Sequence, residues 1–487
     1  MNLLLIFVFL GPIIKVVEHL PPLKQLSHQE KDALILKLWE ENRQLRKEIQ
    51  QLKVRLAKLE AKLNDPPKTS ENSSVPPSKT PKPNLFSDQL EGELDQPRPG
   101  HHKGGKPLHP NPDHFLKAIL DTCPKCGENV PESDQSLLAV YDKYTLPPIK
   151  PIVTRVNLYQ GKCSTCHHVF VAPVPKGMEP GSPYDDSIIS HATYFHFLHA
   201  ISYERLDHLF QDIFHLPISE GAIANMFQDV KERFRPRAAE ILERVRNSQW
   251  VGSDETGARV AGKNAYEWVF QNDEVCYHTI RPKRNQVVMN EVMGDHHPLF
   301  WVSDLYNVQK NNPAKFWQVC LSHQIRNCQY AVDAGDQIFA PQMLQLFARA
   351  FRIYHRHRAL PFSEPELLQL RLDLKHQLEQ CLRLEPLNPH GKRLKKRYQK
   401  LRENLFLFLE YPFIPPTNNA SEQAIRMSVI FRKVTNGFRS WWGAEVFAFV
   451  RSIVNTGRRQ GLNAYQAIQK ALSPVESFFE GGGARCI

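Results

Sequence analysis

The stretch QWVGSD at residues 249–254 is an apolar run that closes on a carboxylate, Asp254. A second run of the same kind, LFWVSD at residues 299–304, closes on Asp304. Short apolar runs bounded by polar residues are typical of buried strands. A strand that closes on a carboxylate places that group at the carboxyl edge of a sheet, where α/β proteins form their sites. We therefore expect Asp254 and Asp304 to lie side by side.

A third acid, Glu422, is expected in the first turn of a helix, in the stretch TNNASE at residues 417–422. Three carboxylates offer hard oxygen ligands, which suit Mg²⁺ or Mn²⁺. On spacing alone this trio is unspecific, because the chain has 51 acidic residues. Helix caps or solvated turns remain the alternative interpretation for all three.

The surroundings of these acids predict an α/β domain from residue 250 onward. Helices are expected over about 313–416 and over 420–456, with an interruption at 435–437. The segments that are typical of strands are 251–254, 266–271, 275–280 and 299–303.

Basic residues cluster after Glu422 and are candidates for phosphate contacts. The candidates are Arg426, Arg432, Lys433 and Arg439, with Arg451, Arg458 and Arg459 further on. The alternative is ordinary charge pairing on a helix, since Glu422 and Arg426 stand four residues apart. Trp441 and Trp442 are expected either to stack on unpaired bases or to join the core.

Composition favours several folded units and a polyanionic partner. The chain has 487 residues, which suggests roughly two to four domains at about 100–200 residues each. Its formal net charge of +11 favours nucleic acid. Hydrophobic residues at 41% and charged residues at 23% exclude wholesale disorder and a multi-pass membrane protein.

Two Cys-x-x-Cys pairs predict a structural zinc site. They are Cys123 with Cys126 and Cys163 with Cys166. Two residues between thiolates let one turn point both sulfurs at an ion, and two such knuckles complete a closed tetrahedral site. The alternative is that they are reduced thiols without a metal. Nine cysteines in this pattern indicate a reducing compartment.

The N-terminal part predicts a coiled coil followed by a linker. Ile35, Asn42, Ile49, Leu56 and Leu63 occupy heptad position a, and the d positions are Leu38, Leu45, Leu52 and Leu59. Such a stripe favours pairing with another helix, and an Asn at position a favours two strands. Packing of one helix against its own protein is the alternative. The proline-rich composition after residue 64 predicts a flexible linker.

The order of these elements resembles that of bacterial insertion-sequence transposases of the TnpC type, the insertion-sequence sixty-six family. The resemblance runs from about residue 34 to 471. It rests on the heptads, NSSVPPS at 72–78, the Cys pairs, DET at 254–256, and NNxxExxxR at 418–426 with Arg432 and Lys433. It implies a DDE transposase in which Asp254, Asp304 and Glu422 bind Mg²⁺ or Mn²⁺. The family's Cys-x-x-His motif matches Cys320 and His323, which we expect on a helix that faces the catalytic centre.

The resulting expectation is a multidomain α/β protein of the bacterial cytoplasm that associates with the nucleoid. Its expected partners are element-end and target DNA, a second copy through the coiled coil, and accessory proteins of the same element, but no membrane. The alternatives are a zinc-dependent DNA-binding regulator with an idle α/β domain, and a metal-dependent nuclease that acts alone. The expected organisation begins with an apolar segment 1–30, a coiled coil 31–64, a disordered linker 65–114 and a zinc ribbon 115–175. A helical DNA-binding segment 176–247, compatible with a helix-turn-helix, follows. A ribonuclease-H-like catalytic domain 248–470, with a helical insertion at about 313–416, and a tail 471–487 complete the chain.

Overall fold

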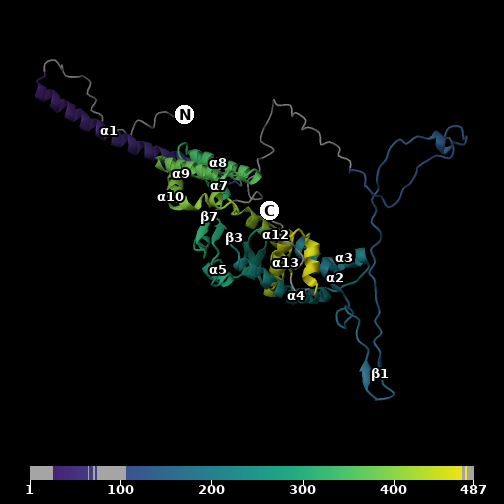
Figure 1. The fold of residues 1–487 in the computed structure, drawn as a ribbon. Coiled ribbons are helices and arrows are strands. Elements are labelled where there is room, and N and C mark those ends of the chain that lie inside the picture. The colour runs from purple at the N-terminus through teal and green to yellow at the C-terminus, as the bar shows by residue number, and fades with distance from the viewer. Residues whose placement is uncertain (1–25, 64, 70–71, 74–105, 474–477, 480–487) are drawn as a thin grey trace. The chain divides into compact units, whose positions relative to one another are not determined.

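The computed structural model describes residues 26–63, 65–69, 72–73, 106–473 and 478–479. The chain divides into two compact units (Figure 1). The first unit combines residues 1–81, 189–200 and 227–487, and the second combines 82–188 and 201–226. Most of the predicted N-terminal segment, linker and tail, at 1–25, 74–105 and 480–487, lies outside the described residues.

A five-stranded mixed sheet forms the centre of the first unit, with the order β5-β4-β3-β6-β7. Its strands are β3 (Trp250–Val260), β4 (Lys263–Gln271), β5 (Cys276–Arg281), β6 (Phe300–Ser303) and β7 (Phe316–Val319). β3, β4 and β5 pair antiparallel, whereas β6 and β7 continue the sheet parallel to β3. All four predicted strands are present, and β7 is an additional one.

Two long helices pack against the antiparallel half of this sheet. α12 (Asn419–Thr435) contacts β3 and β4, and α13 (Trp441–Arg459) contacts β5. Their interruption falls where the sequence predicts it, because Asn436 and Gly437 both have positive φ. The unit also contains the helices α5 (Gln286–Met293), α6 (Asn307–Lys310) and α14 (Ala464–Leu472), and the ends of α2 (Asp186–His199) and α4 (Glu220–Arg246).

A helical layer with its own core leaves the sheet after β7 and returns at α12. It lies within the range in which the sequence predicts a helical insertion. Leu374, Phe347 and Tyr398 are among its buried side chains. A capping box at Ser363 and Glu366 begins one of its helices. Its elements are α7 (Leu321–Asp333), α8 (Ala340–Ala359), α9 (Glu364–Arg383), α10 (Pro389–Leu401), η3 (Arg402–Asn404) and α11 (Leu407–Glu410).

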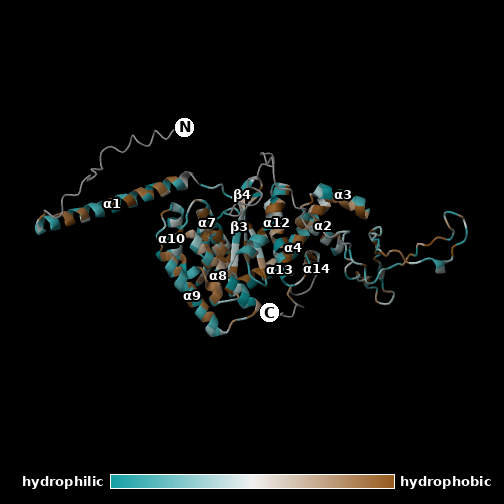
Figure 2. Cartoon of the chain, turned by 90° about the horizontal axis from the view of Figure 1, so that it is seen from above, coloured by the Kyte–Doolittle hydropathy of each residue, from teal (hydrophilic) through white to brown (hydrophobic). Residues whose placement is uncertain are grey.

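The helix α1 (His28–Leu63) covers the predicted heptads. Hydrophobic residues recur along its length (Figure 2). The apolar a and d residues from Ile35 to Leu59 remain 46–63% exposed, so α1 does not bury this stripe against its own chain. The beginning of the predicted linker differs from expectation, since Asn72 is buried and donates a hydrogen bond to Asp333 Oδ2 (3.0 Å).

The second unit has little regular structure before its helix α3 (Tyr203–Phe214). It contains η2 (Glu132–Asp134) and a hairpin of β1 (Gln160–Lys162) and β2 (Val169–Val171). The apolar runs 137–141 and 152–158 form no strands, and their side chains Leu138 and Ile152 are almost fully exposed. Among the helices of the described residues, none has both the length and the apolar character needed to span a membrane.

A buried polar network joins α12 and α13 to the sheet. Glu267 on β4 accepts a hydrogen bond from Ser428 Oγ (2.8 Å) and lies 2.8 Å from His278 Nδ1. His278 Nε2 in turn lies 2.8 Å from Asn455 Nδ2 on α13 and 3.3 Å from Cys276 Sγ. All of these side chains are buried. The network fixes α12, the helix that carries Glu422, in register with the strands.

Glu267→Ala is expected to lower the free energy of unfolding by about 3–5 kcal/mol, because removing one member of a buried ionic pair leaves the others without partners. The control is Glu274→Ala, at an exposed position in the connection between β4 and β5. It should change the free energy of unfolding by less than about 0.5 kcal/mol. Urea unfolding followed by circular dichroism measures both. Equal midpoints for the two variants would contradict the assignment of Glu267 to this network.

Candidate active site

β3 and β6 bring the two predicted aspartates to one edge of the sheet. The strands run parallel, and Gly252 is opposite Val302. Asp254 and Asp304 each follow two residues later, so they stand at the same level. The expectation that these two residues are neighbours is therefore met by the register of the sheet.

One detail differs from the expectation. Asp254 does not end its strand, because β3 continues to Val260 in a hairpin with β4. β6 pairs with β3 only as far as Gly252, and beyond it β3 pairs with β4 and, at Val260, forms a bridge with Phe438. Ala261 and Gly262, both with positive φ, form the tight turn that closes this hairpin.

Glu422 reaches the same edge from the first turn of α12. Asn418, the N-cap residue of α12, is buried, and its Nδ2 donates a hydrogen bond to the backbone oxygen of Ser253 (2.8 Å). Its backbone N–H lies 3.1 Å from Cys320 Sγ. The start of α12 is therefore attached both to β3, one residue before Asp254, and to the start of α7.

The neighbouring acids influence the charge of Asp254. Burial raises the pKa of its carboxyl well above the usual range. The negative charges of Glu255, Asp304 and Glu422 raise the pKa of Asp254 further. Two of these neighbours, Asp304 and Glu422, are the acids that the sequence singles out together with Asp254.

A second group, from α7, contacts Glu422. His323 Nδ1 lies 3.5 Å and Arg326 Nη2 lies 3.7 Å from Glu422 Oε1. His323 also lies 3.3 Å from Cys320 Sγ, and ligand atoms of Cys320, His323 and Glu422 are all within 4.8 Å of one another. Burial raises the pKa of the Cys320 thiol to about 11. The Cys-x-x-His motif thus lies against Glu422 at the start of α7.

Sequence reasoning missed the residues that surround Glu255. This side chain is buried and accepts hydrogen bonds from Arg284 Nη2 (2.6 Å) and Gln309 Nε2 (2.8 Å). Arg284 also stacks on the ring of Tyr306, with its Cζ 3.8 Å from the ring centre. The signal for Glu255 was present, because a strand that is apolar up to residue 253 also buries its next inward side chain. Its partners follow other strands and have no fixed spacing from it.

The three carboxylates have the chemistry of a divalent-cation site, but their ligand atoms do not all lie within 4.8 Å of one another. Among the described residues, Glu422 Oε1 is buried without a hydrogen-bond partner, and negative neighbours disfavour the ionised form of Asp254. Both features are those expected of oxygen ligands prepared for a cation, and hard oxygens select Mg²⁺ or Mn²⁺. Asp254, Asp304 and Glu422 are the residues that would hold it.

Adding Mg²⁺ or Mn²⁺ to metal-free protein is expected to raise its melting temperature. Because the pKa of Asp254 is raised, the free energy of unfolding falls as the pH rises from about 3.9, the usual pKa of Asp, to the raised value, and stays lowered above it. A bound cation offsets this repulsion. At about 100 times Kd the cation would stabilise the fold by about 2.7 kcal/mol. Asp254→Asn should melt higher than the parent without metal and should respond less to it.

The control for this measurement is Asp295→Asn, which removes an exposed carboxylate from the loop before β6. It should melt and respond to metal like the parent. A parent protein that shows no metal-dependent shift from pH 6 to 8, or an Asp254→Asn variant that shifts as much as the parent, would contradict the cation site.

The predicted phosphate-binding residues have different environments. Arg426, Lys433 and Arg439 are exposed on or just after α12, whereas Arg432 is half-buried. The Arg432 side chain lies over Gly257 on β3. A Cβ added at Gly257 would lie 3.1 Å from Arg432 Nη1. Glu422 pairs with Arg326, and no ion pair joins it to Arg426 in the described part of the chain. The structure therefore does not contain the ion pair between Glu422 and Arg426 that the alternative interpretation requires.

Arg451 is not available to phosphates. It is buried beneath the sheet, where burial lowers the pKa of its guanidinium to about 10. Its guanidinium lies within hydrogen-bonding distance of Asn455 Oδ1 (3.3 Å) and of the backbone oxygen of Ala424 (3.4 Å). The expectation for this residue is therefore wrong, because α13 presents this face to the core rather than to solvent.

The structure forms each cysteine knuckle but does not bring the two together. Backbone N–H groups of Cys126 and Lys125 lower the pKa of Cys123, and those of Cys166 and Thr165 do the same for Cys163. Among the described residues, the only group of three or more possible metal ligands is the one at Glu422. The knuckles lie in a part of the second unit that has few buried side chains to hold them together, so the zinc site stays a prediction.

Three comparisons with known proteins bear on this site. A family model described as "Transposase IS66 family" matches residues 181–446, which include all three acids. No protein with a curated description matches the sequence. Among solved structures, one chain of the "Crystal structure of the Mos1 Strand Transfer Complex" is 13% identical, covering 47% of this chain and 80% of that chain. Its TM-score is 0.13, which is too low to show a shared fold.

Proposed function

Because this chain belongs to the IS66 family of transposases, we propose that it is a DDE enzyme that cleaves and joins the ends of an insertion sequence. The observation that supports the chemistry is the convergence of Asp254, Asp304 and Glu422 at one edge of the sheet. A DNA-binding regulator has no need to gather acids whose charges repel one another. Their electrostatic cost is understandable if they act together on a cation.

The residues around the acids suit phosphoryl transfer. Mg²⁺ or Mn²⁺ bound by the three carboxylates would activate the attacking oxygen and stabilise the departing one. His323 and Arg326 hold the Glu422 carboxylate in place. Arg284 and Arg326 put positive charge beside a site that the DNA backbone would enter. The exposed Arg426, Lys433 and Arg439 extend this positive surface along α12.

The mixed sheet would serve as the ribonuclease-H-like core that the family implies. Its antiparallel half anchors α12 and α13 through the buried network at Glu267. Its parallel half supplies the strand end that carries Asp304. The helical layer between β7 and α12 would be the insertion, which supports Glu422 through α7.

The remaining parts would bring two DNA ends together. The exposed apolar stripe of α1 fits a second copy of this chain, which makes a dimer through a coiled coil. The two cysteine knuckles and α3 would bind element-end DNA, with zinc closing the knuckles. Accessory proteins of the same element and the bacterial nucleoid are the further partners and location that we propose.

The test is a cleavage and joining assay with the full-length protein. The substrate is a plasmid that carries the DNA flanking this gene, incubated with Mg²⁺, with Mn²⁺ or with a chelator. We expect nicks at the element boundaries and joined products only with metal. Binding without any cleavage would favour the regulator, and cleavage without joined products would favour a nuclease that acts alone.

A further inference from the structure

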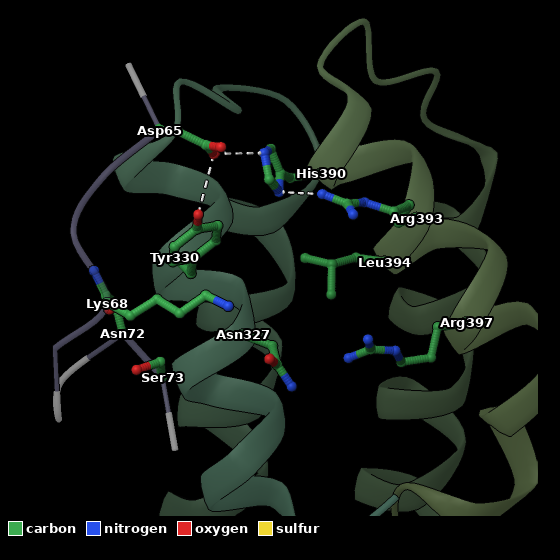
Figure 3. A pocket seen from close by; sticks show the side chains of 10 residues that line it. All are labelled: Asp65, Lys68, Asn72, Ser73, Asn327, Tyr330, His390, Arg393, Leu394 and Arg397. Carbon is green, nitrogen blue, oxygen red and sulfur yellow. Dashed lines mark hydrogen bonds and ion pairs between the residues drawn. The ribbon is translucent and has the colours of Figure 1, made fainter. Parts of the chain in front are cut away.

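A cavity of about 790 Å³ lies between α7, α10 and the segment 65–73 that follows α1. It belongs entirely to the first unit. Figure 3 shows Lys68 and Arg397 extending into it from opposite walls, with Asn327 between them. Neither the acids at the sheet edge nor the basic residues after α12 line this cavity.

Specific contacts hold the wall that the segment 65–73 contributes. Asp65 Oδ1 accepts a hydrogen bond from Tyr330 Oη (3.1 Å) and pairs with His390 Nε2 (3.2 Å). At its other end, Asn72 bonds to Asp333 on α7 and is 5% exposed. Lys68 is thus fixed opposite α10 by anchors on either side.

The cavity is positively charged. Lys68, Arg393 and Arg397 line it, and Asp65 is its one lining carboxylate within the described residues, so its cations outnumber its acids. Arg397 Nη1 is buried and has no hydrogen-bond partner in the described part of the chain. A donor of this kind is satisfied when an anion binds. These donors therefore suit an anionic ligand with several oxygen acceptors.

The surroundings favour a polymer of phosphates over a small anion. Lys392, Lys396 and Lys400 are exposed on α10. A second cavity, of about 740 Å³, continues past Arg393 to Arg55 and Lys58 on α1. Cations therefore extend well beyond the space that one phosphate group fills. The phosphodiester backbone of a duplex carries charges at regular intervals that would occupy such a row.

We propose that Lys68, Arg393 and Arg397 bind the phosphodiester backbone of duplex DNA, at a site separate from the three acids. This inference rests on the proposed function, since it assumes that the protein acts on DNA. Residues 65–69 and 72–73, which follow α1 in the sequence, thereby complete the binding site. DNA held here would be positioned by its backbone without any reading of sequence.

The test compares the full-length parent with the double variant Lys68→Gln/Arg393→Gln. The Kd for a duplex of unrelated sequence is measured by fluorescence anisotropy from 50 to 300 mM NaCl, with chelator present. Loss of two phosphate contacts is expected to reduce the slope of log K against log salt by about 2 and to weaken binding at every salt concentration. Both residues are exposed, so the fold should persist, and the melting temperature verifies it.

The matched control is Lys375→Gln/Arg383→Gln, which removes two exposed cations from α9 of the same helical layer. It should bind DNA like the parent. An unchanged Kd and slope for Lys68→Gln/Arg393→Gln would overturn the proposal. A second outcome would also overturn it: inorganic phosphate raises the melting temperature of the parent and the control but not of Lys68→Gln/Arg393→Gln, while that variant still binds DNA like the parent. The cavity would then bind a small anion only.

The outcome is separable from that of the proposed function. If the parent cleaves DNA and the variant binds it like the parent, the cavity proposal fails alone. If the parent never cleaves, the proposed function fails, and the salt slopes still show whether the cavity binds DNA.

Discussion

Asp254→Asn is expected to lower metal-dependent DNA cleavage by more than about 100-fold, which exceeds the loss usual for residues that only support a metal ligand. Asn keeps the size of the side chain but removes the charge that a cation requires. DNA binding should be unchanged, because the basic residues on α12 do not depend on Asp254. Single-turnover cleavage of element-end DNA and a binding titration with chelator measure the two effects.

Asp304→Asn and Glu422→Gln should have equally large effects if the three acids act as one group. Asp295→Asn, the exposed carboxylate change, should cleave at the rate of the parent. His323→Ala is expected to be milder, about 10–100-fold, because His323 only contacts Glu422. Undiminished cleavage by Asp254→Asn in protein with the parent's melting temperature would remove this residue from the proposed mechanism.

Much of this site could be predicted because its signals are local. An apolar run that closes on an acid fixes both the strand and the position of the carboxylate, as at Asp304. The motif at 418–422 also has a local cause, since the first Asn occupies the N-cap position of α12 and bonds to β3 while the Glu stands in the first turn. The family could be identified from the order of such motifs, and the match over residues 181–446 confirms it.

The rest depends on contacts between distant segments. β7 spans only Phe316–Val319 and lies inside the range 313–416, for which the sequence predicts helices. Arg451 was a candidate for phosphate contacts, but the buried face of α13 includes it. Glu255 receives its cation from Arg284, which lies 29 residues further on and past two strands. No spacing rule predicts such partners, because the sheet alone brings them together.

The sequence predicts both that α1 is a helix and that its apolar stripe pairs with another helix. The heptads predict a helix, and α1 is a helix. The alternative, that its apolar stripe packs on the same chain, does not hold for Ile35 to Leu59, which stay exposed. What covers the stripe is a property of the assembly, and it must be measured on the protein in solution.

Leu45→Asp/Leu52→Asp is expected to convert a dimeric protein into a monomer. Burying one Leu side chain contributes about 1.5–3 kcal/mol, and each substitution acts in both copies of a symmetric pair. The four lost side chains together would remove about 6–12 kcal/mol, which is comparable to the whole free energy of a micromolar dimer. Light scattering coupled to gel filtration measures the mass directly.

The control places the same charges on the outer face of the same helix. Gln44→Asp/Gln51→Asp has the same seven-residue spacing at heptad position c, so it adds equal charge and a similar cost in helix propensity. It should remain dimeric, and it should still join two DNA ends. If both double variants dissociate, charge rather than the stripe decides assembly. If neither dissociates, the copies meet through another surface, and α1 does not pair the protomers.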